Sequence, residues 1–170
     1  MDDIVPYQFF ISLPMKKAIA LGLFLMSAGT LASASTLLEQ ALACQLKDSQ
    51  LPTLMRDLAA QQPAFAKPAA QYGAPSADVY QLAAPVKAFG YASAEIVITS
   101  GRILLAVPGE SLPKAIGKLK LTEEPYSPAS RPVRPTVSVV ALEMTHKTLE
   151  NKLLVGCQYA NNDAARWILP

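Results

Sequence analysis

Few residues in this sequence have the chemistry that catalysis needs. His146 is the only histidine among 170 residues, so the chain has one side chain of the type that exchanges a proton readily near neutral pH. A serine hydrolase would need a serine nucleophile beside this histidine, but the sequence contains no Gly-x-Ser-x-Gly motif. Ser100 is better explained as a small residue in a predicted hairpin turn. One histidine also excludes a multi-histidine metal site. We expect His146 to end an apolar strand face at the rim of a sheet, and we assign no catalytic residue, metal or cofactor.

The other catalytic patterns have simpler explanations. Glu123 and Glu124 have the chemistry for acid and base catalysis, but they adjoin Pro125 at the start of a predicted loop and fit a solvated helix end. Glu143 and His146 are three residues apart, a spacing that puts them on opposite faces of a strand. The glycines are dispersed singly, so no phosphate-binding loop is present. We therefore predict that the protein is not an enzyme.

The two cysteines, Cys44 and Cys157, predict a disulfide. An even number of cysteines in an exported chain favours a bridge, and only one pairing exists. The bridge would tie the first element to the last, and no Cys-x-x-Cys spacing indicates a redox role. One alternative is a pair of separate buried thiols. Another is lipidation of Cys44, because residues 41–44 resemble a lipoprotein cleavage box, although Glu39 and Gln40 separate that box from the hydrophobic region.

The stretch from Met15 to Ala34 has the features of a secretory signal peptide. Lys16 and Lys17 form a positive n-region, residues 18–31 are apolar, and Ala-Ser-Ala ends the stretch as a small-residue cleavage site before Ser35. A transmembrane anchor is the alternative, but it needs about 20 apolar residues and this run has 14. We therefore expect cleavage, no stable membrane span, and a periplasmic or secreted location.

Three parts follow from this interpretation. Residues 1–14 form an upstream extension whose Asp2 and Asp3 are atypical of an n-region, and residues 15–34 are the signal peptide. Residues 35–170 (170 − 34 = 136 residues) have the size of a single domain. That part keeps 13 basic and 11 acidic residues. Because these charges are scattered, we do not expect nucleic acid as a partner.

The expected domain opens with two helices. Thr36 and Glu39 form a capping box before an apolar stripe that includes Cys44. A second stripe between Leu51 and Leu58 ends near Pro63, so the two helices should form a short hairpin. A third helix follows a cap at Ser111. Proline-rich residues 63–78 are expected to be a surface loop or a partly extended arm, and residues 122–135 a second proline-rich loop.

Strand signals occupy most of the remaining chain. Four apolar stretches are expected as strands between Asp78 and Val107, with Ser100-Gly101 as a two-residue hairpin turn. Two more are expected over 136–146 and 152–159. This order predicts an α+β fold in which an N-terminal helix pair and a further helix lie on one face of an antiparallel sheet that four to five of these stretches form. The order is similar to that of small secreted folds of the beta-lactamase-inhibitor-protein kind, a resemblance of architecture alone.

A Leu-Pro-x5-Leu frame occurs twice, starting at Leu51 and at Leu112. One explanation is an internal duplication of an αββ unit, whose two copies pair into one sheet. The other is that Leu-Pro makes a good helix start twice. Outside the frame the halves align poorly, so the pattern leaves both explanations open.

Recognition by a surface is the function class that remains. Tyr91 lies in a predicted hairpin turn, and Tyr126, Arg131 and Arg134 lie in the second proline-rich segment. Aromatic and arginine side chains on stiff backbone suit a binding surface. The alternative is that the tyrosines pack onto the domain and the arginines are solvated. The sequence favours a periplasmic protein that binds another macromolecule in the cell envelope, as an inhibitor, immunity protein or accessory factor would. A small-ligand carrier and, third, an envelope hydrolase are the alternatives.

The cleavage site gives a direct prediction. When the full chain is expressed in a Gram-negative host, intact mass and N-terminal sequencing of the periplasmic protein should give a chain that begins at Ser35. Ala34→Leu should slow this processing, because the peptidase accepts only small side chains there. Recovery of a chain that still begins at Met1 or Met15 would contradict the interpretation.

Overall fold

The fold is described by a computed structural model that covers residues 36–168. The chain divides into two units, Met1–Ser33 and Ala34–Pro170, and the described residues belong to the second. The upstream extension, the signal peptide and the cleavage site between Ala34 and Ser35 lie outside the described residues and stay predictions. Over residues 36–168 no helix is long and apolar enough to cross a membrane.

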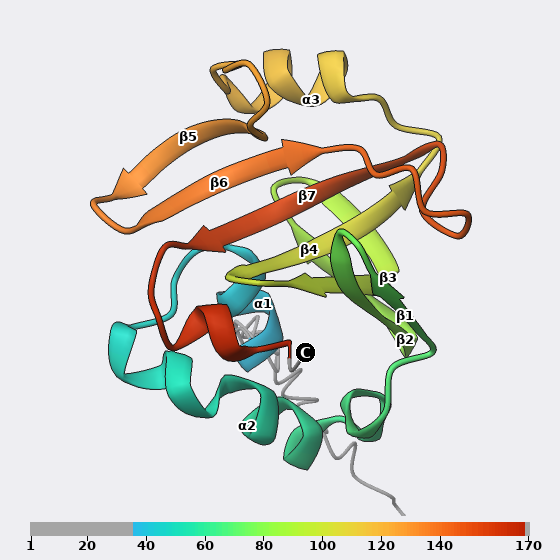
Figure 1. Ribbon diagram of the computed structural model, residues 1–170, viewed down its shortest axis with the longest axis vertical. Coiled ribbons are helices and arrows are strands. Elements are labelled where there is room, and N and C mark those ends of the chain that lie inside the picture. Colours follow the sequence, from blue (N-terminus) through green and yellow to red (C-terminus); the bar gives the residue numbers. More distant parts are fainter. Residues whose placement is uncertain (1–35, 169–170) are drawn as a thin grey trace, which may run out of the picture. The chain divides into compact units, whose positions relative to one another are not determined.

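One antiparallel sheet of seven strands dominates the described part of the chain (Figure 1). Strands that follow each other in sequence pair with each other, apart from the junction of β4 with β7, which joins the two halves of the chain. The order across the sheet is β1-β2-β3-β4-β7-β6-β5. The strands are β1 (Ala70–Gly73), β2 (Ser76–Ala88), β3 (Tyr91–Thr99), β4 (Arg102–Pro108), β5 (Ala129–Arg134), β6 (Val137–Leu142) and β7 (Lys152–Tyr159).

The predicted α+β class is confirmed, but the expected four to five strands are too few. Residues 63–78, predicted to be a loop or a partly extended arm, contain β1 and the start of β2, and residues 122–135, predicted to be a loop, contain β5. β1 and β5 are the two edge strands of the sheet. Proline is tolerated at an edge because its missing N–H costs no ladder hydrogen bond, and Pro132 lies within β5.

Strand boundaries differ from the expectation in two further places. Two predicted strands are one long β2, whose pairing with β3 shifts register between Gln81 and Val86, where Pro85 lies. The strand expected to reach His146 ends at Leu142. The predicted Ser100-Gly101 turn is confirmed, and Gly101 has the positive φ (+72°) that such a turn favours.

Helix α1 (Leu37–Leu42) begins at the predicted capping box. The hydroxyl of Thr36 accepts a hydrogen bond from the Glu39 amide (3.2 Å), and the Glu39 carboxylate accepts one from the Thr36 amide (2.9 Å). Both bonds satisfy N–H groups that have no partner within the helix. The apolar side of α1 is fully buried at Leu38, Ala41 and Leu42.

The expected helical hairpin is not formed. A 3-10 helix over Asp48–Thr53 precedes α2 (Leu54–Gln61), and a second 3-10 helix (Pro63–Ala66) follows it. α1 packs mainly on β2, β4 and β7, whereas α2 packs mainly on these flanking turns. The hydrophobic stripe of α1 is thus satisfied by the sheet rather than by a partner helix. The third helix, α3, spans Leu112–Leu119.

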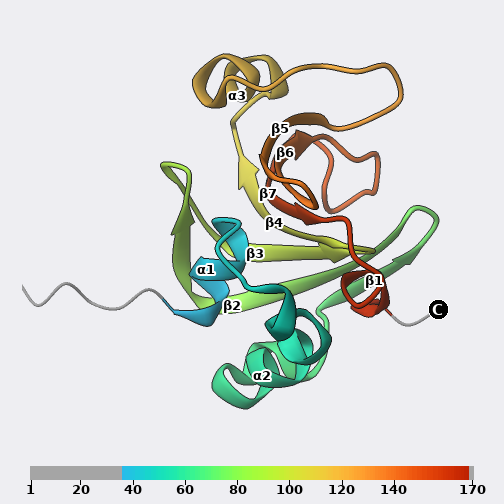
Figure 2. The same cartoon turned by 90° about the vertical axis from the view of Figure 1, so that its left-hand side faces the viewer.

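Side chains alternate between two apolar clusters on the two faces of the sheet. Ile103 and Leu105 belong to the larger cluster, which also takes the buried side chains of α1, α2 and α3. Leu104 and Ala106 belong to a smaller cluster on the opposite face, together with Leu149 from the β6–β7 connection. Figures 1 and 2 show how the strands of this sheet curve around α1.

Contacts between the β1–β2 hairpin and the β6–β7 connection close one side of the smaller cluster. The Tyr72 ring stacks on His146 with 4.2 Å between ring centroids, and its hydroxyl bonds to Thr148. His146 Nε2 lies 2.8 Å from the carbonyl oxygen of Pro75, so this nitrogen carries the donated proton. The single histidine therefore holds two connections of the sheet together.

The topology has a symmetric order about the β4–β7 junction. In each half a helix precedes a three-strand meander, β2-β3-β4 after α2 and β5-β6-β7 after α3, and β1 is additional in the first half. The unit in each half is thus helix and three strands rather than the expected αββ. The duplication itself stays a prediction.

Gly156 gives a sharp test of the junction. A Cβ at this position in β7 would lie 2.2 Å from the Ile103 carbonyl oxygen and 2.9 Å from Leu104 Cα, both backbone atoms of β4. Gly156→Ala should therefore lower the free energy of unfolding by at least about 3 kcal/mol in chemical denaturation. Gly117→Ala in α3 is the matched control, because a Cβ there meets nothing within 4 Å. Gly117→Ala should stabilise the protein by about 0.5 to 1 kcal/mol. Equal effects of the two variants on the free energy of unfolding would contradict the close approach of β7 to β4 at Gly156.

Candidate functional site

Tyr126 is presented by a closed loop between α3 and β5. Two backbone hydrogen bonds join Thr122 and Ser130, with N–O distances of 2.8 and 2.9 Å, and the Ser127 amide donates to the Glu124 carbonyl (3.2 Å). Tyr126 has a positive φ of 62° and is fully exposed. An aromatic ring on a closed, proline-flanked loop loses little conformational entropy on binding.

Val133 is the other large apolar side chain that is exposed within residues 36–168, at 49%. It lies in β5, where the pairing with β6 shifts register between Pro132 and Arg134. Arg131, also exposed, donates from Nε to the carbonyl of Leu119 at the end of α3 (3.0 Å). We call Tyr126, Arg131 and Val133 the β5 surface.

A cavity of about 420 Å³ opens beside the Tyr126 loop. The loop contributes Tyr126 and Pro128 to its lining, α3 contributes Leu112, and the end of β6 contributes Leu142 and Glu143. The Glu143 carboxylate accepts a hydrogen bond from the Leu112 amide (3.2 Å), whereas the Ser111 side chain, expected to cap this helix, makes no such bond. The acid thus anchors the start of α3.

Tyr91 is not available as a surface anchor, because it is 7% exposed. The Lys118 ammonium lies 3.6 Å from the centroid of its ring and donates to the Gly90 carbonyl (3.1 Å). Burial, and then the negative charge of Glu110, raise the pKa of the Tyr91 phenol. The residue joins the β2–β3 turn to α3.

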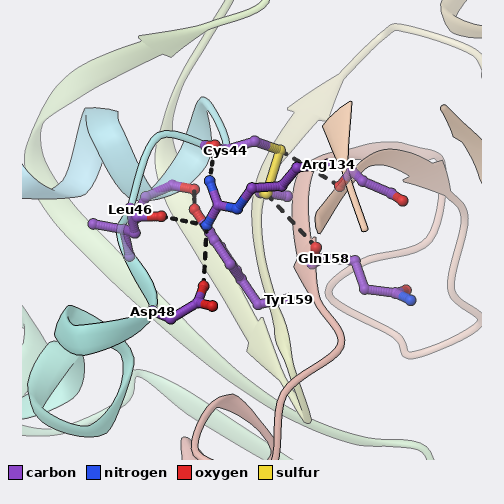
Figure 3. Close-up of a disulfide and its surroundings, with 9 residues drawn as sticks. Cys44, Leu46, Asp48, Arg134, Gln158 and Tyr159 are labelled. Atoms are coloured by element: carbon purple, nitrogen blue, oxygen red, sulfur yellow. Dashed lines mark hydrogen bonds and ion pairs between the residues drawn. A yellow bond between two sulfur atoms is a disulfide. The ribbon is translucent and has the colours of Figure 1, made fainter. Parts of the chain in front are cut away.

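Arg134 is also engaged within the protein (Figure 3). Its guanidinium donates to the carbonyls of Cys44 (3.4 Å) and Leu46 (2.5 Å) and lies 3.4 Å from the Asp48 carboxylate. It therefore ties the end of β5 to the segment that follows α1. The four residues expected to form one binding surface are thus split, with Tyr126 and Arg131 exposed and Tyr91 and Arg134 packed against other elements.

The predicted disulfide between Cys44 and Cys157 is confirmed (Figure 3). It joins the segment after α1 to β7 across a sequence separation of 113, with the Cα atoms 5.2 Å apart. The neighbouring Tyr159 donates its hydroxyl proton to the Ala41 carbonyl (2.8 Å), and burial raises its pKa. The disulfide and these polar contacts fix α1 against the sheet.

A second cavity, of about 590 Å³, was not expected from the sequence. It lies between the end of α2 with its following turn (61–64) and the irregular part of β2 (81–86). Its lining is Ala, Pro, Leu, Val and Gln, without a charged side chain. The sequence signal was the run Leu82-Ala83-Ala84-Pro85, which marks the irregularity in β2 but does not show what packs beside it.

Comparisons with known proteins assign no family. No protein-family model, no curated protein and no solved structure matches the chain. Within residues 36–168 no three His, Cys, Asp or Glu side chains are grouped so that they could hold a metal ion.

Arg134 and Arg131 form a matched pair for a stability test. Arg134→Ala should lower the free energy of unfolding by about 2 kcal/mol, because it leaves buried carbonyls without a charged donor. Arg131→Ala should change it by less than about 0.5 kcal/mol, as expected for an exposed side chain. Urea denaturation of the oxidised protein measures both values. A stability of Arg134→Ala equal to that of the wild type would show that the guanidinium does not hold the segment after α1.

Proposed function

We propose that the chain is an exported, non-enzymatic protein that binds another protein of the cell envelope through the β5 surface, as an inhibitor, immunity protein or accessory factor would. One observation carries the proposal. The two large apolar side chains exposed within residues 36–168, Tyr126 and Val133, both lie in the proline-rich segment 122–135. Val133 lies in the edge strand β5, which no further strand of the described residues covers, and Tyr126 lies in the loop before it, so both side chains are accessible to a partner.

The chemistry of this surface supports recognition by side chains. Tyr126 supplies an aromatic anchor and Arg131 a cation, two residue types that contribute strongly to interfaces. Val133 adds apolar area between Pro132 and Arg134. Because Pro132 has no N–H and lies in the edge strand, continuous pairing of a partner strand along β5 is disfavoured.

Two features support the exported location. Residues 15–34 have the pattern of a signal peptide, and the Cys44–Cys157 disulfide is of a kind that persists in oxidising compartments. A periplasmic protein would meet its partner in such a compartment.

A small-ligand carrier is the second candidate function, and the uncharged cavity of about 590 Å³ between α2 and β2 favours it. A ligand retained in a native mass spectrum of the purified protein would support the carrier.

The binding proposal is tested with the double variant Tyr126→Ala/Arg131→Ala. Immobilised wild-type protein and variant are exposed to solubilised envelope from the source cells, and captured proteins are quantified by mass spectrometry. Arg56→Ala is the control, because that side chain is 76% exposed on α2, away from the β5 surface. We expect one partner to be lost at least about tenfold in the double variant, since loss of a hot-spot residue costs 2 kcal/mol or more.

The same partner should be retained by Arg56→Ala. Circular dichroism and thermal melting confirm that each variant is folded. Equal capture of every envelope protein by the double variant and the control would overturn the β5 surface as the binding site.

A further inference from the structure

Arg102 is the one charged residue of β4, a strand that is otherwise apolar and central in the sheet. It pairs with Thr99 on β3 and with Gln158 on β7. Alternation along β4 places Arg102 on the same face as Leu104 and Ala106, the face of the smaller apolar cluster. Arg102 is half-buried at the first position of this strand, directly after the Ser100-Gly101 turn.

The guanidinium of Arg102 is only partly satisfied within the protein. Nε donates to the side-chain oxygen of Gln158 (2.7 Å), while Nη1 and Nη2 make no hydrogen bond or ion pair with any residue in 36–168. Of the ion pairs in that range none involves Arg102. Burial without a neighbouring anion lowers the pKa of the group. The hydrogen bond to Gln158 offsets part of the desolvation cost of this half-buried side chain, and the two outer nitrogens remain available to a ligand.

Two cavities meet at Arg102. One of about 270 Å³ is lined by Arg102 with Ser100, Gln158, Asn161 and Asn162, and no carboxylate lines it. The other is the cavity of about 420 Å³ beside Tyr126. Thr99, opposite Arg102 in the ladder, is 4% exposed, and its hydroxyl has no hydrogen-bond partner in the described structure. In the cavity of about 270 Å³, Arg102 is thus the one charged side chain and neutral amide groups lie beside it, whereas the carboxylate of Glu143 lines the other cavity.

We propose that Arg102 binds a carboxylate group, with the amides of Gln158, Asn161 and Asn162 around it. The planar guanidinium presents two parallel donors that match the two oxygens of a carboxylate. A phosphate dianion fits less well, because this site offers a single cation. The carboxylate belongs either to a small free acid or to an Asp or Glu side chain of a bound protein. The cavity of about 270 Å³ contains no residue of the β5 surface, so the carboxylate site is separate from that surface.

The proposal is tested by NMR titration of the full exported protein with its disulfide intact. The probes are sodium acetate and N-acetyl-aspartic acid amide, at constant ionic strength set with sodium chloride. N-acetyl-asparagine amide is the neutral control probe. We expect saturable shifts of the backbone amides at 99–102 and 158–162 with one or both acids and none with the neutral probe.

Binding by acetate without the capped aspartate would identify a small free acid as the source. Binding of the capped aspartate at least as tightly would identify an acidic side chain. Both outcomes support the site. Absence of saturable shifts with either acid, equal shifts with the neutral probe or with chloride alone, or tighter binding of inorganic phosphate than of acetate would overturn it.

Variants assign the binding to the guanidinium. Arg102→Gln should weaken acetate binding at least about tenfold, because the charge and the fork are both lost. Arg56→Gln, at an arginine on α2 that is 76% exposed and lines neither cavity, should leave it unchanged. Arg102→Lys keeps the charge but loses the planar fork, so it should weaken acetate binding several-fold. This variant tests the site even if Arg102→Gln does not fold. Equal affinity in Arg102→Lys and the wild type would overturn the bidentate site.

Discussion

The pairing of β4 with β7 is the constraint on which the rest of the structure depends. It joins the two three-strand meanders into one sheet, and its register runs from Arg102 opposite Gln158 to Pro108 opposite Lys152. The two backbones approach so closely at Gly156 that a methyl group would overlap the carbonyl of Ile103. Alternate residues of this pair supply both apolar clusters, so a shift of register by one residue would exchange the two faces.

Two further interactions act on the segment that follows α1. Cys44 is bonded to Cys157 of β7, and the carbonyls of Cys44 and Leu46 accept hydrogen bonds from Arg134 at the end of β5. The covalent bridge restricts the unfolded chain, whereas the guanidinium satisfies backbone oxygens in the folded state. The C-terminal part adds a third contact, because Trp167 donates from Nε1 to the Leu51 carbonyl (2.9 Å). The short helical segments therefore depend on the sheet for their position.

The distribution of aromatic and arginine residues shows why residue type alone does not define a binding surface. Tyr91 and Arg134 have the same chemistry as Tyr126 and Arg131, but their polar and ring groups contact Lys118 and the segment after α1. Of the exposed pair, Arg131 lies within the edge strand β5 and Tyr126 in the loop that precedes it. Arg102 differs from both pairs, because it is central in the sheet and its outer nitrogens have no partner in the described protein. The position of each residue in the sheet therefore determines whether its side chain contacts other elements of the protein or stays available to a partner.

Local signals in the sequence were sufficient where the interaction spans a few residues. The capping box of Thr36 and Glu39 and the turn at Ser100-Gly101 depend on neighbouring residues alone, and the disulfide followed from there being only two cysteines. The edge strands β1 and β5, the failure of α1 and α2 to pair, and the separation of Arg134 from Arg131 were decided by the tertiary structure. Each depends on strands distant in sequence that meet only once the sheet is complete. Pro132 is accommodated in β5 because a sheet edge leaves its missing N–H without cost, and arginines acquire different roles because only the assembled sheet determines which carbonyls lie within reach.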